Sequence, residues 1–275
     1  MTEKKSLLPV KSDFVFKLIF GDQRNIDILA DFLKSILDIP HEDYENLVII
    51  DPHVKKESAD DKYGILDVKI NTKSGKIVHV EVQLLFIPEM IERSMYYQSK
   101  MITEQIFSGQ DYSVIKKVIS IIITDYTLIT KNKDYHNQFR YRTKEGTELT
   151  DLTEINLLEL TKLPAKTDSS QLWNWMKFMN TEDEEEIAML EQRNPQISKA
   201  VGVLKELSAD ERTRMLYEDR EKARRDIASM LGGARREGRQ EEKHQAARNA
   251  IEMGMDTETI MKLTGLSREE ILGLK

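Results

Sequence analysis

The sequence changes its hydrophobic period between residues 47 and 86, and this change limits the possible folds more than any other feature. Apolar and polar residues alternate in YGILDVKI, which contains Asp67, and again in KIVHVEVQLLF, which contains Glu81. An alternation with a period of two is typical of β-strands. The NTKSGK segment between them is rich in turn-forming residues. The region therefore predicts a β-hairpin with a carboxylate near the middle of each strand.

The segments on either side of the hairpin predict an α/β fold. Residues 12–38 and 88–109 carry the apolar patterns of helices, and VISIIIT at 118–124 is a nearly continuous apolar run. Such a short run is typical of a strand that is buried on both faces. A further strand is expected around FRYRT at 139–143, and from about residue 168 onward the pattern is helical. We predict a mixed sheet flanked by helices, followed by a helical C-terminal region.

Composition excludes several kinds of site. The chain has 275 residues, of which 40% are hydrophobic and 32% charged, and it has no cysteine. A disulfide scaffold and cysteine-based metal or nucleophile sites are therefore excluded, and a reducing compartment is favoured. The N-terminal residues lack the apolar core of a signal peptide, and the longest apolar run is too short to span a bilayer. We expect a cytoplasmic protein without a membrane segment.

The distribution of charge limits how the chain could contact nucleic acid. A formal net charge of −7 argues against coating nucleic acid through bulk positive charge, although it allows a local basic groove around an acidic site. Residues 205–253 are dense in Arg, Lys and Glu, and basic and acidic side chains are equally numerous over residues 205–275. This alternation of sign favours an exposed, ion-paired helix over a DNA-binding arm. Such a helix would act as a linker or in homo-oligomerisation.

The last residues predict a short helix–turn–helix. Asp256 can cap the first helix, and Ser267 with Glu270 has the spacing of a capping box for the second. Such pairs can read DNA, but the second helix offers few basic residues, so packing against a partner is an equal alternative. The predicted segments are a core at 1–165, a helical extension at 166–204, a charged linker or association helix at 205–253, and the helix–turn–helix at 254–275.

The predicted hairpin brings two like charges close together. If its turn is centred near Ser74, Asp67 lies directly opposite Glu81 on the same face, with Cβ atoms about 5 Å apart. Like charges in such a pair are destabilising, so a cation is expected between them. A hard divalent cation prefers carboxylate and carbonyl oxygens. Gln83 lies on the same face, two residues after Glu81, and could reach the same space.

A simpler interpretation is that this face of the hairpin is its solvent face. The side chains that would then point outward as ordinary surface residues are Asp67, Lys69, His79, Glu81 and Gln83. In that case Lys69 could neutralise Glu81 as a cross-strand ion pair. The hairpin pattern by itself leaves both interpretations open.

Four segments together resemble a known family. They are KSDFVFKLIFGD, GILDVKI, HVEVQ and ERSMYYQSKMITEQIFSGQDY. In this order they resemble the Rpn family of recombination-promoting nucleases, also described as transposases, in the PD-(D/E)XK nuclease superfamily. The resemblance covers residues from about 9 to 165, and the ending GMDTETIMKLTGLSREEI is also typical of such chains. It implies a restriction-endonuclease-like core for residues 1–165.

The resemblance assigns roles to the carboxylates. Asp67 and Glu81 match the acidic residues of the superfamily motif, and Gln83 stands where the motif has lysine. The implied site holds Mg²⁺ through Asp67, Glu81 and the backbone carbonyl of Val82, while Gln83 positions the attacking water. Lysine would supply a positive charge, whereas glutamine can only form hydrogen bonds. This departure puts the strength of the catalysis in question, and it leaves the metal site intact.

Other residues could complete this site. Asp13 or Glu57 could be an additional acidic metal ligand, although each could equally be a helix cap or a surface charge. Arg93, Tyr97 and Lys100 share a face of the helix after the motif strand, where they could contact DNA. The alternative for Tyr97 is that it packs in the core.

The function implied by the resemblance is a metal-dependent DNA endonuclease that promotes recombination or is related to transposases. Two alternatives belong to other classes. One is a catalytically weak or inactive DNA-binding or regulatory protein on a nuclease fold, and the other is a self-association protein that acts through its C-terminal helices. The pair Asp67 and Glu81 distinguishes them, because an inactive nuclease would have little reason to keep like charges opposed.

Overall fold

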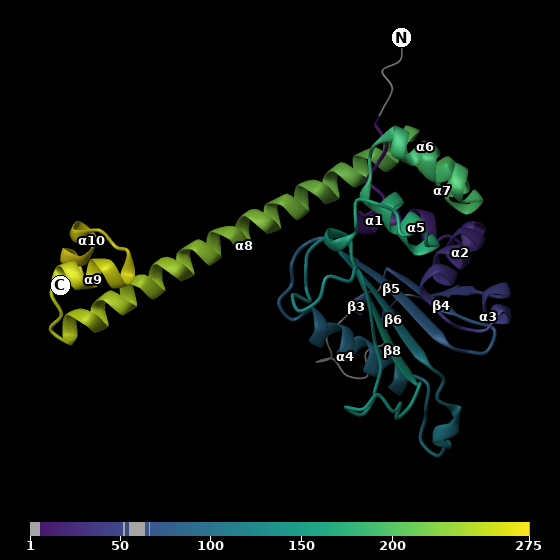
Figure 1. Ribbon diagram of the computed structural model, residues 1–275, viewed down its shortest axis with the longest axis horizontal. Helices are drawn as coiled ribbons and strands as arrows, with labels where there is room; N and C mark the ends of the chain where they lie inside the picture. The colour runs from purple at the N-terminus through teal and green to yellow at the C-terminus, as the bar shows by residue number, and fades with distance from the viewer. Residues whose placement is uncertain (1–5, 52, 55–63, 66, 275) are drawn as a thin grey trace, which may run out of the picture. The chain divides into compact units, whose positions relative to one another are not determined.

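The computed structural model describes residues 6–51, 53–54, 64–65 and 67–274. The chain divides into two compact units, with the boundary between residues 217 and 218. The first unit contains a six-stranded sheet with helices on both faces, and the second unit is helical (Figure 1). The helical bounds in the first unit are α1 Asp13–Phe20, α2 Ile26–Ile36, α3 His41–Glu45, α4 Met90–Thr103, α5 Gln171–Asn180, α6 Glu184–Arg193 and α7 Pro195–Ala209. Short 3-10 helices are η1 Gln23–Asn25, η2 Tyr112–Val114 and η3 Leu160–Lys162.

The six-stranded sheet is mixed, as predicted. Its strands are β1 Val48–Ile50, β4 Val68–Asn71, β5 Ile77–Gln83, β6 Val118–Thr124, β7 His136–Phe139 and β8 Thr153–Glu159. They lie in the order β1-β4-β5-β6-β8-β7, and a separate pair is formed by β2 His53–Val54 and β3 Gly64–Ile65. The central strands β5, β6 and β8 are parallel, while the remaining pairs of the large sheet are antiparallel. The α/β class and the flanking helices are therefore confirmed.

The hairpin of β4 and β5 has the predicted register. Val68 lies opposite Val80, and Lys69 lies opposite His79. Its turn includes Gly75, whose φ of +83° lies in the left-handed region that favours glycine. Continued by one residue, the same register brings Asp67 opposite Glu81.

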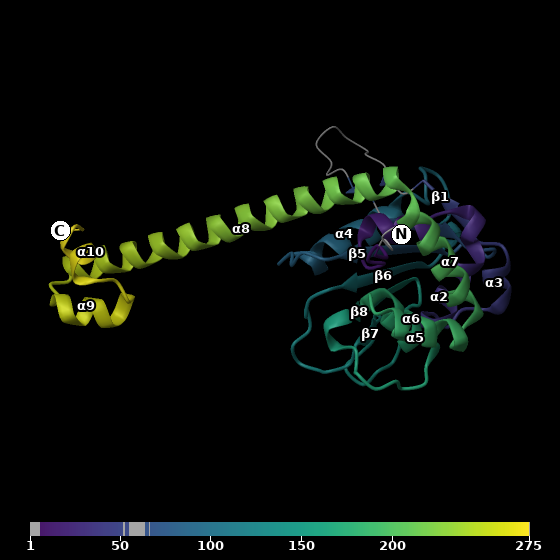
Figure 2. The ribbon, with the colours of Figure 1, turned by 90° about the horizontal axis from the view of Figure 1, so that it is seen from above.

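One face of the sheet supports a large hydrophobic core. Helices α1, α2, α5 and α7 contact one another there, with α1 also against β5, and they group together in both ribbon views (Figures 1 and 2). An aromatic cluster forms between α1, α2 and α5, where Trp175 contacts Phe20, Phe32 and Phe178 edge to face. The indole N–H of Trp175 donates to Asp31 at 2.9 Å, which satisfies its only donor inside the core. Sequence predicts this burial, because these helices repeat apolar residues on one side.

Helix α4 covers the opposite face of the sheet. Its residues Tyr97 and Met101 pack against Val118, and its Gln98 amide donates to the Ser120 hydroxyl at 3.2 Å. Under α4, the side chains of Lys69, His79 and Glu81 are all buried. The interpretation of this face as a solvent face is therefore wrong, because α4 excludes water from it. Lys69 pairs with Glu104 at 3.3 Å rather than with Glu81.

Two elements have bounds that differ from the sequence prediction. Helix α4 stops at Thr103 rather than near residue 109. The reason is that Gln105 exchanges two hydrogen bonds with the backbone of Lys116, which turns the chain back toward β6. Strand β7 spans His136–Phe139, so the strand expected at 139–143 begins earlier and overlaps the prediction only at Phe139. The alternation of apolar and polar residues in one segment does not show which other strand it pairs with, and here the partner of β7 is β8.

The second unit is built from three helices. Helix α8 Glu211–Glu252 begins in the first unit and continues into the second, where α9 Thr257–Thr264 and α10 Arg268–Leu272 follow. A small core joins them, formed by Ala247, Ala250, Ile260, Leu266 and Ile271. Asp256 accepts from the amide of Thr259, and Ser267 and Glu270 form a complete capping box. Both predicted caps are confirmed, and Gly265 closes α9 with a φ of +69°.

No helix in the described part of the chain is long and apolar enough to cross a membrane.

Candidate active site

Asp67 immediately precedes β4 and lies against the C-terminal half of β5. Its Oδ2 accepts a hydrogen bond of 2.7 Å from the backbone N–H of Val82. Its Oδ1 lies 3.9 Å from the ammonium of Lys17, which comes from α1. The Asp67 side chain is only 14% exposed. Three elements thus meet at this carboxylate, and the hairpin register is what brings it to β5.

Glu81 lies on β5 under α4, with 3% of its surface exposed. Its Oε1 forms an ion pair of 2.8 Å with the guanidinium of Arg93, from the first turn of α4. Its Oε2 is buried and has no hydrogen-bond partner among the described residues. Buried carboxylate oxygens are normally satisfied, so an unsatisfied one is a marker of a missing ligand or ion.

Burial and neighbouring charges shift the pKa of both carboxylates. Burial raises the pKa of Asp67 from 3.8 to about 7, and the charges of Glu81 and Asp13 push it in the same direction. The Val82 N–H and the charge of Lys17 oppose this rise. Burial also raises the pKa of Glu81, and Arg93 opposes that rise. Two ionised carboxylates are therefore costly here at neutral pH, and a bound cation would remove that cost.

The donor set suits a hard divalent cation. Asp67 and Glu81 supply carboxylate oxygens, and the Oε2 of Glu81 is unsatisfied in the described structure. A strand residue directs its N–H and C=O toward the same side, so the Val82 carbonyl faces the side from which Asp67 accepts. Mg²⁺ commonly binds through one or two carboxylates and keeps several waters, so two carboxylates and a carbonyl are enough. No cluster of three or more His, Asp or Glu side chains suited to a metal occurs among the described residues.

The two candidates for an additional acidic ligand differ in what the structure says of them. Asp13 is exposed at the start of α1, and its charge reaches Asp67. Glu57 lies outside the described residues. Gln83 ends β5, and its amide donates to the backbone carbonyl of Leu85 at 3.3 Å. Because an amide is neutral, Gln83 contributes no charge to the site.

The three α4 residues expected at DNA lie differently from one another. The guanidinium of Arg93 lies 5.4 Å from the centre of the Tyr97 ring, which confirms that these two side chains share a face of the helix. Tyr97 is only 7% exposed and packs with Met101 and Val118, so it is not available to stack on a base. Arg93 is 34% exposed. Lys100, one turn beyond Tyr97, is partly exposed.

Two residues near the site were missed by the sequence reasoning. Lys17 follows Asp13 by one helical turn, and this spacing is the signal that could have found it. Tyr126 comes just after β6, and its pKa is raised by burial, with a further contribution from the charge of Glu81. No local pattern marks Tyr126, because only the parallel pairing of β5 with β6 brings it near Glu81.

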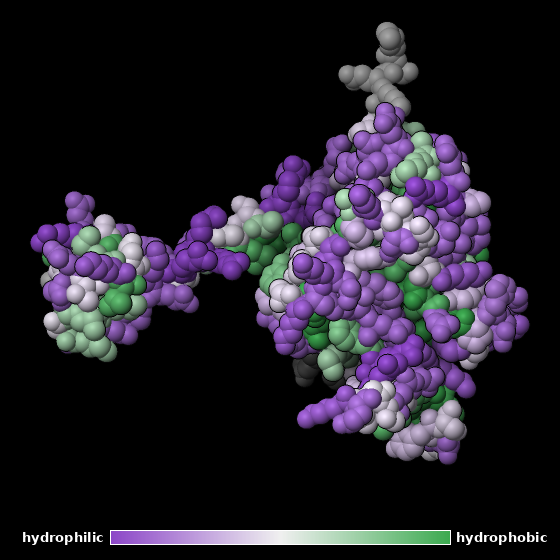
Figure 3. All heavy atoms as spheres, in the orientation of Figure 1, coloured by the Kyte–Doolittle hydropathy of each residue, from purple (hydrophilic) through white to green (hydrophobic). Residues whose placement is uncertain are grey.

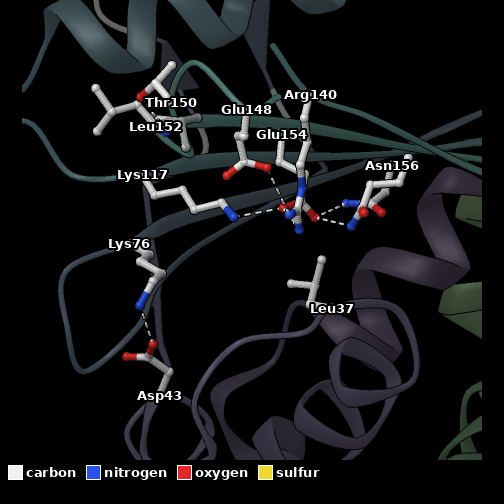
Figure 4. Close-up of polar contacts among 12 residues, drawn as sticks. Leu37, Asp43, Lys76, Lys117, Arg140, Glu148, Thr150, Leu152, Glu154 and Asn156 are labelled. Carbon is white, nitrogen blue, oxygen red and sulfur yellow. Dashed lines mark hydrogen bonds and ion pairs between the residues drawn. The ribbon is translucent and has the colours of Figure 1, made fainter. Parts of the chain in front are cut away.

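A second buried carboxylate, Glu154 on β8, is fully paired. It accepts from Lys117 at 2.7 Å and from Arg140 at 2.9 Å on one oxygen, and from Gln138 and Asn156 on the other (Figure 4). Burial tends to raise its pKa, but these partners, Lys117 foremost, outweigh burial and lower it. Glu154 therefore stabilises the attachment of β7 to the sheet. Both of its oxygens have partners, unlike those of Glu81.

Comparison with known families accounts for nearly the whole chain. Residues 10–234 match the family model described as PD-(D/E)XK nuclease family transposase. Residues 240–275 match the C-terminal helix–turn–helix domain of the Rpn/YhgA-like nuclease family. No curated protein and no solved structure shows significant similarity to the chain.

Proposed function

The chain belongs to the PD-(D/E)XK nuclease family of transposases and ends in the helix–turn–helix domain of Rpn/YhgA-like nucleases, and from this premise we propose that it is a metal-dependent DNA endonuclease. One observation carries the proposal. Two carboxylates lie on the same hairpin, the buried Glu81 and the largely buried Asp67, and one buried Glu81 oxygen is unsatisfied among the described residues. A buried carboxylate with a purely structural role would have partners for its oxygens, as Glu154 has.

Asp67, Glu81 and the Val82 carbonyl would hold the ion, for which Mg²⁺ is the proposed identity. When bound, it would lower the pKa of a water molecule and stabilise charge on the scissile phosphate. Asp67 must lose its proton to act as a ligand, and the Val82 N–H and Lys17 stabilise its ionised form. Gln83 is proposed to orient the attacking water through its amide. Asp13 is proposed as a further acidic group at the edge of the site.

DNA would contact the protein at two places. On α4, Arg93 and Lys100 are proposed to bind backbone phosphates, whereas the buried Tyr97 is not part of this proposal. In the second unit, the helix–turn–helix of α9 and α10 is proposed to bind DNA, which the family match supports. The proposed setting is the cytoplasm, where such an enzyme would act on cellular DNA and promote recombination.

A cleavage assay tests the activity. Purified protein is expected to nick or cut plasmid DNA with Mg²⁺ and to leave it intact with EDTA, while Asp67→Asn and Glu81→Gln abolish cleavage. The matched control is Asp27→Asn, which removes an exposed carboxylate of α2 that pairs with Lys199. This control should cleave like the wild type. Equal cleavage by Asp67→Asn and the wild type would refute the proposal, and DNA binding without any cleavage would favour an inactive DNA-binding protein.

Self-association through α8 is a further proposal. This helix exposes apolar side chains at helical spacing among many charged ones (Figure 3), notably Ile227, Met230 and Leu231. Apolar residues three and four apart form the seam of helical dimers. Replacing Ile227 and Met230 by glutamate is expected to lower the sedimentation coefficient, if the wild type sediments as an oligomer. A monomeric wild-type protein at micromolar concentration would refute this proposal.

A further inference from the structure

The site lacks the positive charge that its motif would normally provide. Phosphodiester hydrolysis develops negative charge on the phosphate, and preorganised cations or donors aimed at that charge make a large contribution to catalysis. Gln83 occupies the lysine position of the motif and is neutral. Its amide, moreover, already donates to the Leu85 carbonyl. The missing charge must come from another element if the enzyme is to be efficient.

Helix α4 places a cation directly at the carboxylate pair. The Arg93 guanidinium lies 2.8 Å from Glu81 Oε1 and 5.4 Å from the centre of the Tyr97 ring. Tyr97 is fixed by its packing with Met101 and Val118, so its ring provides a rigid support for the guanidinium. The Nε of Arg93 is buried and has no hydrogen-bond partner among the described residues. Arg93 is thus held in place while part of its donor capacity is unused.

We infer that Arg93 supplies from α4 the positive charge that the motif lysine would have supplied, and that it competes with the metal ion for Glu81. This inference rests on the proposed function. Without metal, Arg93 neutralises Glu81, which would otherwise be a buried charge beside Asp67. Glu81 would hold the ion through its unsatisfied Oε2, which would weaken its ion pair with Arg93 at Oε1 and leave the guanidinium free for the phosphate of bound DNA.

Arginine suits this exchange better than lysine. Its planar group carries five donors, so it can remain on an aromatic face while its N–H groups change partner. It also stays charged in every protein environment, so the positive charge persists after Glu81 has been given up. Lys17 cannot replace it, because Lys17 pairs at 3.9 Å with Asp67 and not with Glu81.

Metal titration without DNA separates this inference from the proposed function. Mn²⁺ affinity is measured by calorimetry at pH 8 on the full chain for the wild type, Arg93→Gln, Arg93→Lys and Asp67→Asn. Arg93→Gln is expected to bind Mn²⁺ roughly tenfold more tightly, because the ion no longer competes with a cation for Glu81. Arg93→Lys should stay within about threefold of the wild type, because its ammonium keeps the positive charge that competes with the ion for Glu81. The matched control Lys116→Gln removes the same charge from an exposed loop and should not change the affinity.

The outcomes are distinct. Asp67-dependent Mn²⁺ binding that does not change in Arg93→Gln, or that weakens, would overturn the inference while leaving the proposed metal site standing. Absence of any Asp67-dependent binding in the wild type would overturn both.

A second experiment tests whether the two positions supply the same charge. Arg93→Gln is expected to lower the rate of Mg²⁺-dependent cleavage by about a hundredfold, the scale of losing one charge-stabilising donor. Adding Gln83→Lys to that variant restores a cation at the motif position and should recover at least a tenth of the lost rate. Cleavage by Arg93→Gln at the wild-type rate, or no recovery in the double variant, would overturn the substitution of one charge by the other.

Discussion

Replacing Asp67 by asparagine should stabilise the metal-free protein, although it removes a residue proposed to be essential. Asparagine has nearly the same shape, and its carbonyl oxygen can still accept from the Val82 N–H at the position of Asp67 Oδ2. What it removes is a carboxylate whose pKa rises from 3.8 to about 7 on folding, mainly because of burial. A raised pKa means that the folded state holds the proton more tightly than the unfolded chain does.

The sign and size follow from this difference. Folding stability is unaffected below about pH 4, falls as the pH rises from 4 to 7, and then remains constant. At 1.36 kcal/mol per pH unit, the loss reaches about 4 kcal/mol. Because the side chain is 14% exposed, water screens part of this effect and the figure is an upper limit. Asp67→Asn should therefore match the wild type at pH 4 and exceed it by several kcal/mol at pH 8.

Urea unfolding in EDTA, followed by tryptophan fluorescence, measures this difference. Trp173 and Trp175 are both buried in the first unit, so the signal reports on the unit that contains the site. The control is Asp13→Asn, which removes an exposed carboxylate from the first turn of α1. A carboxylate there stabilises the helix dipole but also repels Asp67, so the two effects oppose each other and this control should stay close to the wild type. An Asp67→Asn difference that does not grow between pH 4 and pH 8, or a variant that is less stable than the wild type at pH 8, would contradict the raised pKa of Asp67.

Three further changes test other parts of the fold. Burial tends to raise the pKa of Asp43, but Lys76, which donates to it at 2.6 Å (Figure 4), and Ser74 outweigh burial and lower this pKa from 3.8 to about 2. Asp43→Asn should therefore cost about 2 kcal/mol at pH 7. That cost should disappear as the pH falls from 4 toward 2, because the contribution of a lowered pKa is lost when the group is protonated; urea unfolding at both pH values checks it. Glu154→Gln leaves the cations of Lys117 and Arg140 with a neutral partner, and a loss of about 3–5 kcal/mol with faster hydrogen exchange in β7 is expected. Unchanged exchange would contradict its role in fastening that strand. Gly265→Ala should destabilise the second unit by about 1 kcal/mol, because its φ is +69°, and thermal unfolding of this variant can be compared with Gly202→Ala, a helical site with open space around it.

The site was only partly predictable, and particular residues show why. The opposition of Asp67 and Glu81 follows from hairpin arithmetic, which needs only the position of the turn. Tyr97 shows the limit, because a helical pattern gives the spacing of its neighbours but not which side of the helix meets the sheet. No local pattern could have found Tyr126, since the pairing of strands that are far apart in sequence brings it close enough to feel the charge of Glu81.

The sequence by itself determined the α/β class, the register of the β4–β5 hairpin, and the caps of α9 and α10. These features depend on interactions among residues close along the chain, where period, turn chemistry and capping spacing act directly. The tertiary structure alone decided that α4 buries the face of Glu81 and sets Arg93 against it. The physical reason is that an alternating strand has a polar face in sequence, but only packing by a distant element determines whether that face meets water or a buried cation.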